Sequence, residues 1–132
     1  NDSARIALVN VYLLQKKDEQ ALLELNKLKT GAEHSTRVDL IIARLYAKLK
    51  KYDQAIEILQ TALEQGNTAE ARYLLAVMYF MTEHYDQSLA ELKRIGRDSA
   101  EYKNALFLQV RIFRVRNNLQ KAVELFEHVI GQ

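Results

Sequence analysis

The sequence has no cysteine, no proline and only four glycines in 132 residues. Without cysteine there is no disulfide framework, no cysteine-ligated zinc and no thiol nucleophile. Because proline breaks helix interiors and glycine weakens them, their scarcity indicates a mostly helical chain with short turns. An excess of one charge is also missing, since 19 basic residues stand against 17 acidic ones. Net charge therefore gives no general attraction to nucleic acid.

Long hydrophobic stretches are absent too. The longest apolar run covers residues 73–81, whereas a membrane-spanning helix needs about 20 such residues. We therefore expect a soluble protein without membrane insertion, in a compartment that the sequence does not specify. The chain begins with Asn1 and not with methionine, and it shows no signal peptide. The start at Asn1 predicts a fragment of a longer protein or a processed chain.

The feature that is present is an internal repeat. Two tyrosines, Tyr46 and Tyr52, are separated by five residues, and the second is followed by Asp-Gln. The same pattern returns thirty-three residues later, at Tyr79 and at residues 85–87. Weaker copies lie thirty-four residues before and after this pair. A fixed period of this size indicates an array of small units that form a single repeat domain. The predicted repeats cover residues 2–35, 36–68, 69–102 and 103–132.

Each repeat is predicted to form two antiparallel helices. The apolar residues of the second repeat follow the helical period better than strict alternation. We expect Gly31 and Gly66 to end second helices in the left-handed conformation. Residues 67–68 and 98–99 are expected to supply the N-cap side chains of the helices that follow.

This pattern resembles the tetratricopeptide repeat (TPR) over essentially the whole chain. That family places a small residue and an aromatic on the first helix, an aromatic at the turn, and a small residue on the second helix. The matching positions of the second repeat are Ala43, Tyr46, Tyr52, Ala55 and Ala62. The outer repeats depart from the pattern at Val9, Asp18 and Val110. The resemblance implies an all-α fold, a right-handed α-solenoid of about four antiparallel helix pairs.

The resemblance also implies a concave groove lined by the first helices. Once the core positions of helix 69–81 are assigned, Tyr73, Val77 and Phe80 remain as a second apolar stripe at helical spacing. Such a stripe either packs on neighbouring helices or faces a ligand. We expect it to face a ligand. The equivalent positions that complete the predicted groove are Ile6, Asn10, Leu40, Arg44, Phe107, Arg111 and Arg114.

Aromatic residues interspersed with arginine are typical of the centre of a protein interface. The leading hypothesis is a non-catalytic module that binds a peptide or helix of a partner protein in this groove. The partner would offer apolar anchors and some acidic residues, because arginine meets carboxylates with two hydrogen bonds. The alternative is a self-assembling scaffold, a homo-oligomer that stacks through its terminal helices. It rests on the helix over residues 119–130, which is apolar on more than one face and lacks a polar capping surface.

Other functions have weaker support. The sequence has no glycine-rich phosphate loop, nucleophile elbow or zinc-protease motif, so we expect neither an enzyme nor a cofactor. The three histidines, His34, His84 and His128, are not at metal-ligand spacing, so no metal is expected. The four repeats carry net charges of 0, +1, −2 and +3, and the acidic third repeat interrupts any basic stripe. Nucleic-acid binding is therefore the weakest of the three readings.

Overall fold

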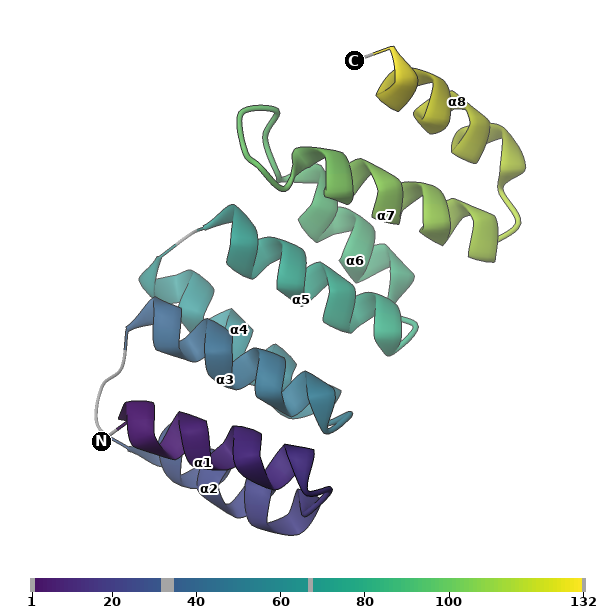
Figure 1. Cartoon of the computed structure of the whole chain (residues 1–132). Coiled ribbons are helices and arrows are strands. Elements are labelled where there is room, and N and C mark those ends of the chain that lie inside the picture. Colours follow the sequence, from purple (N-terminus) through teal and green to yellow (C-terminus); the bar gives the residue numbers. More distant parts are fainter. Residues whose placement is uncertain (1, 32–34, 67, 132) are drawn as a thin grey trace. The chain divides into compact units, whose positions relative to one another are not determined.

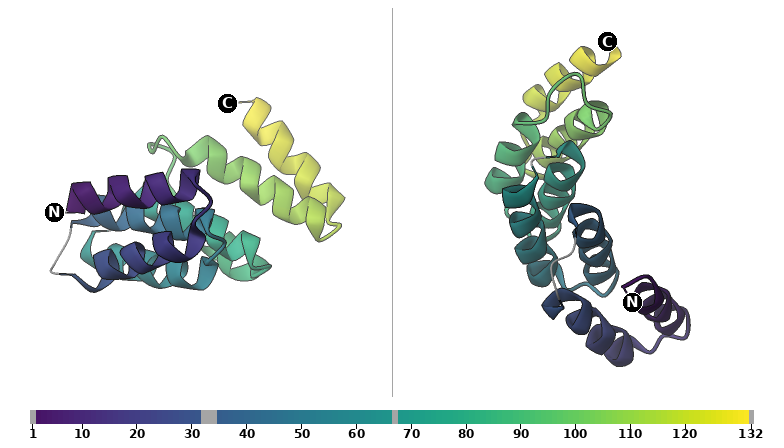
Figure 2. Two further views of the ribbon diagram at one scale, coloured as in Figure 1. Left: turned by 60° about the horizontal axis from the view of Figure 1, so that its bottom comes forward. Right: turned by 90° about the vertical axis from the view of Figure 1, so that its left-hand side faces the viewer.

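The computed structural model describes residues 2–31, 35–66 and 68–131, and within these ranges the chain forms eight helices and no strand. The helices are α1 (Asp2–Leu14), α2 (Asp18–Thr30), α3 (Thr36–Lys48), α4 (Tyr52–Gln65), α5 (Ala69–Met81), α6 (Tyr85–Lys93), α7 (Tyr102–Val115) and α8 (Leu119–Ile130). They form four antiparallel pairs, one in each predicted repeat (Figure 1; Figure 2). The predicted all-α class, built from helix pairs, is confirmed.

The contacts between helices group the chain into an N-terminal half, residues 1–66, and a C-terminal half, residues 67–132. Each half contains two helix pairs and is described separately below. Within the N-terminal half α2 packs on α3, and within the C-terminal half α6 packs on α7. These two junctions show how one repeat is joined to the next.

The turn inside every repeat has the same backbone geometry. One residue of each turn has a positive φ, close to 60°, and these residues occupy equivalent repeat positions. They are Lys16, Lys50, Glu83 and Asn117. The next residue donates its backbone N–H to the carbonyl of the first-helix aromatic, as in the 2.9 Å bond from Lys51 to Tyr46. This is the Schellman arrangement, in which a left-handed residue satisfies the last carbonyls of a helix.

The prediction of left-handed glycine caps after the second helices is wrong. Gly31 and Gly66 have φ angles of −71° and −158°, and the left-handed caps close the first helices instead. Positive φ is costly for non-glycine residues, so the left-handed turn shows that pairing of the two helices outweighs the local preference.

The predicted N-caps are right in one of two places. The Thr68 hydroxyl accepts a 3.2 Å hydrogen bond from the Ala71 N–H at the start of α5, while Asn67 lies outside the described residues. The cap predicted at residues 98–99 is wrong, because α7 starts only at Tyr102. Residues 94–101 form a longer connection, visible as the loop between α6 and α7 in Figure 1.

Small residues lie buried where paired helices pack closely. Ala21 and Ala55 are fully buried in the N-terminal half, and Ser88 takes the same place in the C-terminal half. The Ser88 hydroxyl donates a 2.8 Å hydrogen bond to the Ala76 carbonyl, so this polar group is satisfied inside the core. The C-terminal core cluster consists of Ala76, Leu89, Leu92, Ile95, Ala105, Leu108 and Ile112.

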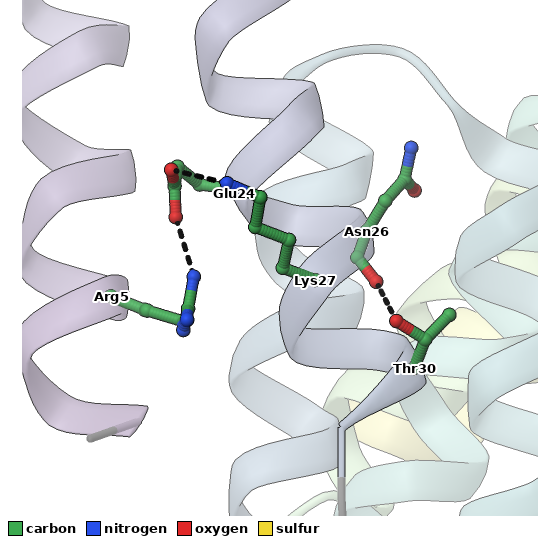
Figure 3. Close-up of polar contacts among 5 residues, drawn as sticks. All are labelled: Arg5, Glu24, Asn26, Lys27 and Thr30. Atoms are coloured by element: carbon green, nitrogen blue, oxygen red, sulfur yellow. Dashed lines mark hydrogen bonds and ion pairs between the residues drawn. The ribbon is translucent and has the colours of Figure 1, made fainter.

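Polar pairs add specific links between helices. Arg5 on α1 binds Glu24 on α2 at 3.0 Å, and Lys27 approaches the same carboxylate (Figure 3). In the third repeat Arg72 on α5 binds Glu91 on α6 at 2.6 Å. These two arginines, like the two glutamates, occupy equivalent repeat positions. One ion pair thus recurs inside two of the four helix pairs.

Candidate functional site

One candidate site is a hollow of about 470 Å³ in the C-terminal half. It is lined by Phe80 of α5, by Arg111, Arg114 and Val115 of α7, and by Leu119 at the start of α8. Apolar walls with a few polar groups are typical of sites that bind a ligand in a fixed orientation. Three of its five lining residues, Phe80, Arg111 and Arg114, belong to the predicted groove.

The ring of Phe80 contacts two neighbouring side chains, those of Arg111 and Tyr85. The Cζ atom of Arg111 lies 4.9 Å from the centroid of the Phe80 ring, which is a cation–π contact. The ring of Tyr85, the turn aromatic, packs against Phe80 with 5.7 Å between the two centroids. The Phe80 ring in the apolar wall of the hollow thus contacts both Arg111 and Tyr85.

Arg111 and Arg114 stand one turn apart on α7, so they project from the same face of that helix. Both side chains are exposed. Neither is ion-paired with a carboxylate anywhere in the part of the chain that the structure describes, whereas the nearby Arg116 binds Asp86 at 2.6 Å. Two guanidinium groups are thus free to form charge-assisted hydrogen bonds with an incoming carboxylate.

The positive charge of Arg111 also acts on Tyr73, which belongs to the predicted apolar stripe on α5. Burial raises the pKa of the Tyr73 phenol above its ordinary value of 10.0, and the Arg111 charge opposes this rise. The hydroxyl therefore stays protonated at neutral pH and can donate a hydrogen bond. The two residues belong to one electrostatic environment.

The predicted stripe on α5 packs on its neighbours and is also partly exposed. Tyr73, Val77 and Phe80 are half-buried, and all three pack against the C-terminal core cluster. Each of them also keeps part of its surface exposed. Phe107 of α7 is exposed as well, and its ring meets that of Phe126 on α8 edge-on, with 6.3 Å between centroids.

The predicted groove residues of the N-terminal half are less uniform. Ile6 on α1 is half-buried, whereas Asn10 on α1 and Arg44 on α3 are exposed. Leu40 is only 6% exposed and lies in the core, so its assignment as a ligand-facing residue is corrected. The reason is that α3 is an internal first helix with six buried residues, whereas α1 has one.

Sequence reasoning named neither Val115 nor Leu119 as part of this site. Leu119 occupies the turn-aromatic position of the fourth repeat, and it is exposed. The equivalent residues, Tyr52 and Tyr85, are half-buried. A leucine where the second and third repeats have tyrosine was the available signal, because the smaller side chain fills less of the space beside α7.

Two further observations concern the described ranges as a whole. They contain no group of three or more histidine, aspartate and glutamate side chains arranged to hold a metal ion, and His34 lies outside them. None of their helices combines the length and the apolar character needed to cross a membrane.

The fold and the repeated turns define a protein built from tandem helix pairs. Among families, the model for subunit 3 of the anaphase-promoting complex, or cyclosome, matches residues 40–95. No curated protein sequence matches the chain. Similarity to solved structures extends over nearly its whole length.

A crystal structure of MamA has a TM-score of 0.79 at 17% identity and covers 99% of this chain and 77% of that one. MamA from Desulfovibrio magneticus RS-1, from residue 41 to its end, has a TM-score of 0.79 at 14% identity. The match covers 99% of this chain and 75% of that one. YrrB, described as a TPR protein with an unusual peptide-binding site, has a TM-score of 0.78 at 19% identity. The match covers 99% of this chain and 68% of that one. The tetratricopeptide-repeat resemblance is confirmed at the level of the fold.

Proposed function

We propose that this chain is a non-catalytic interaction module that binds a peptide segment of a partner protein at the hollow beside α7. The observation that carries the proposal is the pair of exposed, unpaired guanidinium groups of Arg111 and Arg114 at the edge of an apolar hollow. Unpaired charges of one sign next to apolar walls favour a ligand with the opposite charge and an apolar anchor.

The chemistry of the hollow defines the ligand further. One apolar side chain of the peptide would displace water from Phe80, Val115 and Leu119. An adjacent aspartate or glutamate would accept hydrogen bonds from Arg111 or Arg114. The peptide-binding site of YrrB, a TPR protein, supports this class of function for a chain of the same fold.

A fluorescence-anisotropy titration tests the proposal. The probe is a labelled peptide with one leucine between two glutamates, and its reference is the same peptide with glutamines. The glutamate peptide is expected to bind more tightly. The double variant Arg111→Gln/Arg114→Gln is expected to weaken its binding at least about tenfold, because a hydrogen bond to a charged group contributes about 1.5–3 kcal/mol.

The matched control is Arg94→Gln/Arg97→Gln, which removes two exposed arginines with the same spacing outside the hollow. It is expected to change binding little, apart from the weak effect of net charge. Equal losses in both double variants, or equal binding of both peptides, would contradict the site. Alanine at Tyr73 and Phe80 is a poorer test, because both residues pack on the core and their removal lowers stability.

A further inference from the structure

Arg111 and Arg114 bring two positive charges to the hollow of the C-terminal half. None of the described residues that line the hollow is acidic. The Asp86 carboxylate is bound by Arg116 at 2.6 Å. Neither Arg111 nor Arg114 is ion-paired with a carboxylate in the described ranges. The hollow therefore presents two positive charges, one turn apart, that an anionic ligand can neutralise.

The exposure of these two positions is a property of the repeat. Arg111 and Arg114 are equivalent to Val77 and Phe80 of α5. Helix α7 lies beside α5 (Figure 1), yet Val77 and Phe80 both keep part of their surface exposed. A first helix thus keeps this face accessible when another first helix lies beside it. The accessibility of the two arginines is therefore independent of whatever follows α8.

The two arginines can converge on a single anionic group. Residues three apart on a helix have Cβ atoms about 5–6 Å apart, and each guanidinium offers parallel donors to an anion. A carboxylate has one negative charge, so it compensates only one of the two guanidinium groups. A phosphate monoester has a charge of about −1.5 to −2 at pH 7 and three strong acceptor oxygens. One phosphate therefore matches both the charge and the donors of this pair.

Given the peptide-binding function proposed above, on which this step rests, we infer that the partner segment carries a phosphoserine or phosphothreonine next to its apolar anchor. The phosphate binds between Arg111 and Arg114, and the anchor lies against Phe80. Consecutive Cα atoms are about 3.8 Å apart, so a short phosphorylated side chain can meet the arginines while its neighbour fills the hollow. Phosphorylation of the partner thus switches binding on.

The distribution of charge favours one phosphate over the phosphate chain of a nucleic acid. A nucleic acid gains affinity from many contacts along a continuous basic surface. Here the fourth repeat has a net charge of +3, but the third has −2. An apolar hollow of about 470 Å³ beside two arginines suits a single side chain and a single phosphate.

Fluorescence anisotropy with labelled peptides of one length tests this ligand. The first peptide has leucine between phosphoserine and glutamine, and it is made in both orders. The second has leucine between two glutamates, so it carries about the same charge on two separate groups. The third has serine in place of phosphoserine. The phosphoserine peptide is expected to bind about tenfold more tightly than the two-glutamate peptide and about a hundredfold more tightly than the serine peptide.

Single variants test whether both arginines hold the same phosphate. Arg111→Gln and Arg114→Gln are each expected to weaken binding of the phosphoserine peptide about tenfold. The two losses should not simply add in the double variant, because the two side chains share one ligand group. Additive losses would place the arginines on different groups of the peptide and overturn the shared site. Arg94→Gln/Arg97→Gln is again the matched control and should change binding little.

The possible outcomes separate the phosphate from the peptide-binding function itself. If the two-glutamate peptide binds as tightly as the phosphoserine peptide, and Arg111→Gln/Arg114→Gln weakens both, the hollow binds acidic peptides and has no preference for phosphate. If no peptide binds the wild-type chain, the proposed function is wrong as well. A short single-stranded oligonucleotide that binds more tightly than the phosphoserine peptide, and that the same double variant releases, would identify nucleic acid as the ligand. Circular dichroism confirms that every variant is folded.

Discussion

The first and third repeats contain the same ion pair in two different environments. In the third repeat the Arg72 side chain is 9% exposed and lies 2.6 Å from Glu91. In the first repeat the Arg5 side chain is 43% exposed and lies 3.0 Å from Glu24. Helix α5, which carries Arg72, has five buried residues, whereas α1, which carries Arg5, has only one. The position of a repeat in the array, and not the pair itself, decides how far the charges are removed from water.

The other two repeats fill these positions differently. The fourth repeat has leucines there, Leu106 and Leu125, and the second has Asp39 and Ile58. A buried ion pair and a well-packed apolar pair of similar volume are often close in stability, whereas half of an ion pair is costly. The repeats thus offer natural replacements with which the comparison can be tested.

The largest effect is expected from Glu91→Leu, which introduces the residue of the fourth repeat. It removes the carboxylate that lies 2.6 Å from the buried Arg72 and should lower the free energy of unfolding by about 3 kcal/mol. Urea denaturation followed by far-ultraviolet circular dichroism measures this loss. The double variant Arg72→Leu/Glu91→Leu is the control and should recover more than half of it. If the double variant is no more stable than the single, altered packing and not the broken ion pair explains the loss.

The same substitution in the first repeat, Glu24→Leu, is expected to cost less than about 1 kcal/mol. Its partner Arg5 has a side chain that is 43% exposed and can be solvated by water once the carboxylate is gone. Added salt should reduce the wild-type advantage further, because exposed pairs are screened. Denaturation under identical conditions gives the comparison with Glu91→Leu. Equal costs at both positions would show that burial does not separate the two pairs.

Much of the fold could be predicted because the repeat carries it. Small residues such as Ala55 and aromatic residues such as Tyr46 mark where helices pack, and the structure buries both. The left-handed residues could not be located from residue type. Lys50 and Glu83 have no intrinsic preference for positive φ, and the helix pairing imposes it.

The candidate site was only partly predictable for a similar reason. Helical spacing identified Phe80, Arg111 and Arg114, because it shows which residues share a face. It could not show that Leu40 is buried or that Val115 completes the hollow, since both depend on which helices cover a given face. Periodicity predicts faces, and only the packing of one repeat on the next decides which of them stay open.

The smallest effect concerns two tyrosines, Tyr46 of the N-terminal half and Tyr73 of the C-terminal half. Burial is the main cause that raises the pKa of each phenol above 10.0. The negative charge of Glu57 raises the pKa of Tyr46 further, whereas the positive charge of Arg111 lowers that of Tyr73. Because the pKa of each phenol is raised in the folded state, its protonated form stabilises the fold. This contribution to the free energy of unfolding is fully present below pH 10 and is lost as the pH rises through the folded pKa.

Absorbance titration of tyrosinate, compared between wild type and single Tyr→Phe variants, isolates the midpoint of each phenol. Glu57→Gln should lower the midpoint of Tyr46, and Arg111→Gln should raise that of Tyr73. The opposite signs follow from the opposite charges, so a shift in the same direction at both tyrosines would contradict the assigned neighbours. Because Arg111 also lines the hollow, binding of the glutamate peptide should raise the Tyr73 midpoint as the arginine charge is neutralised. An unchanged midpoint on binding would place the peptide away from Arg111.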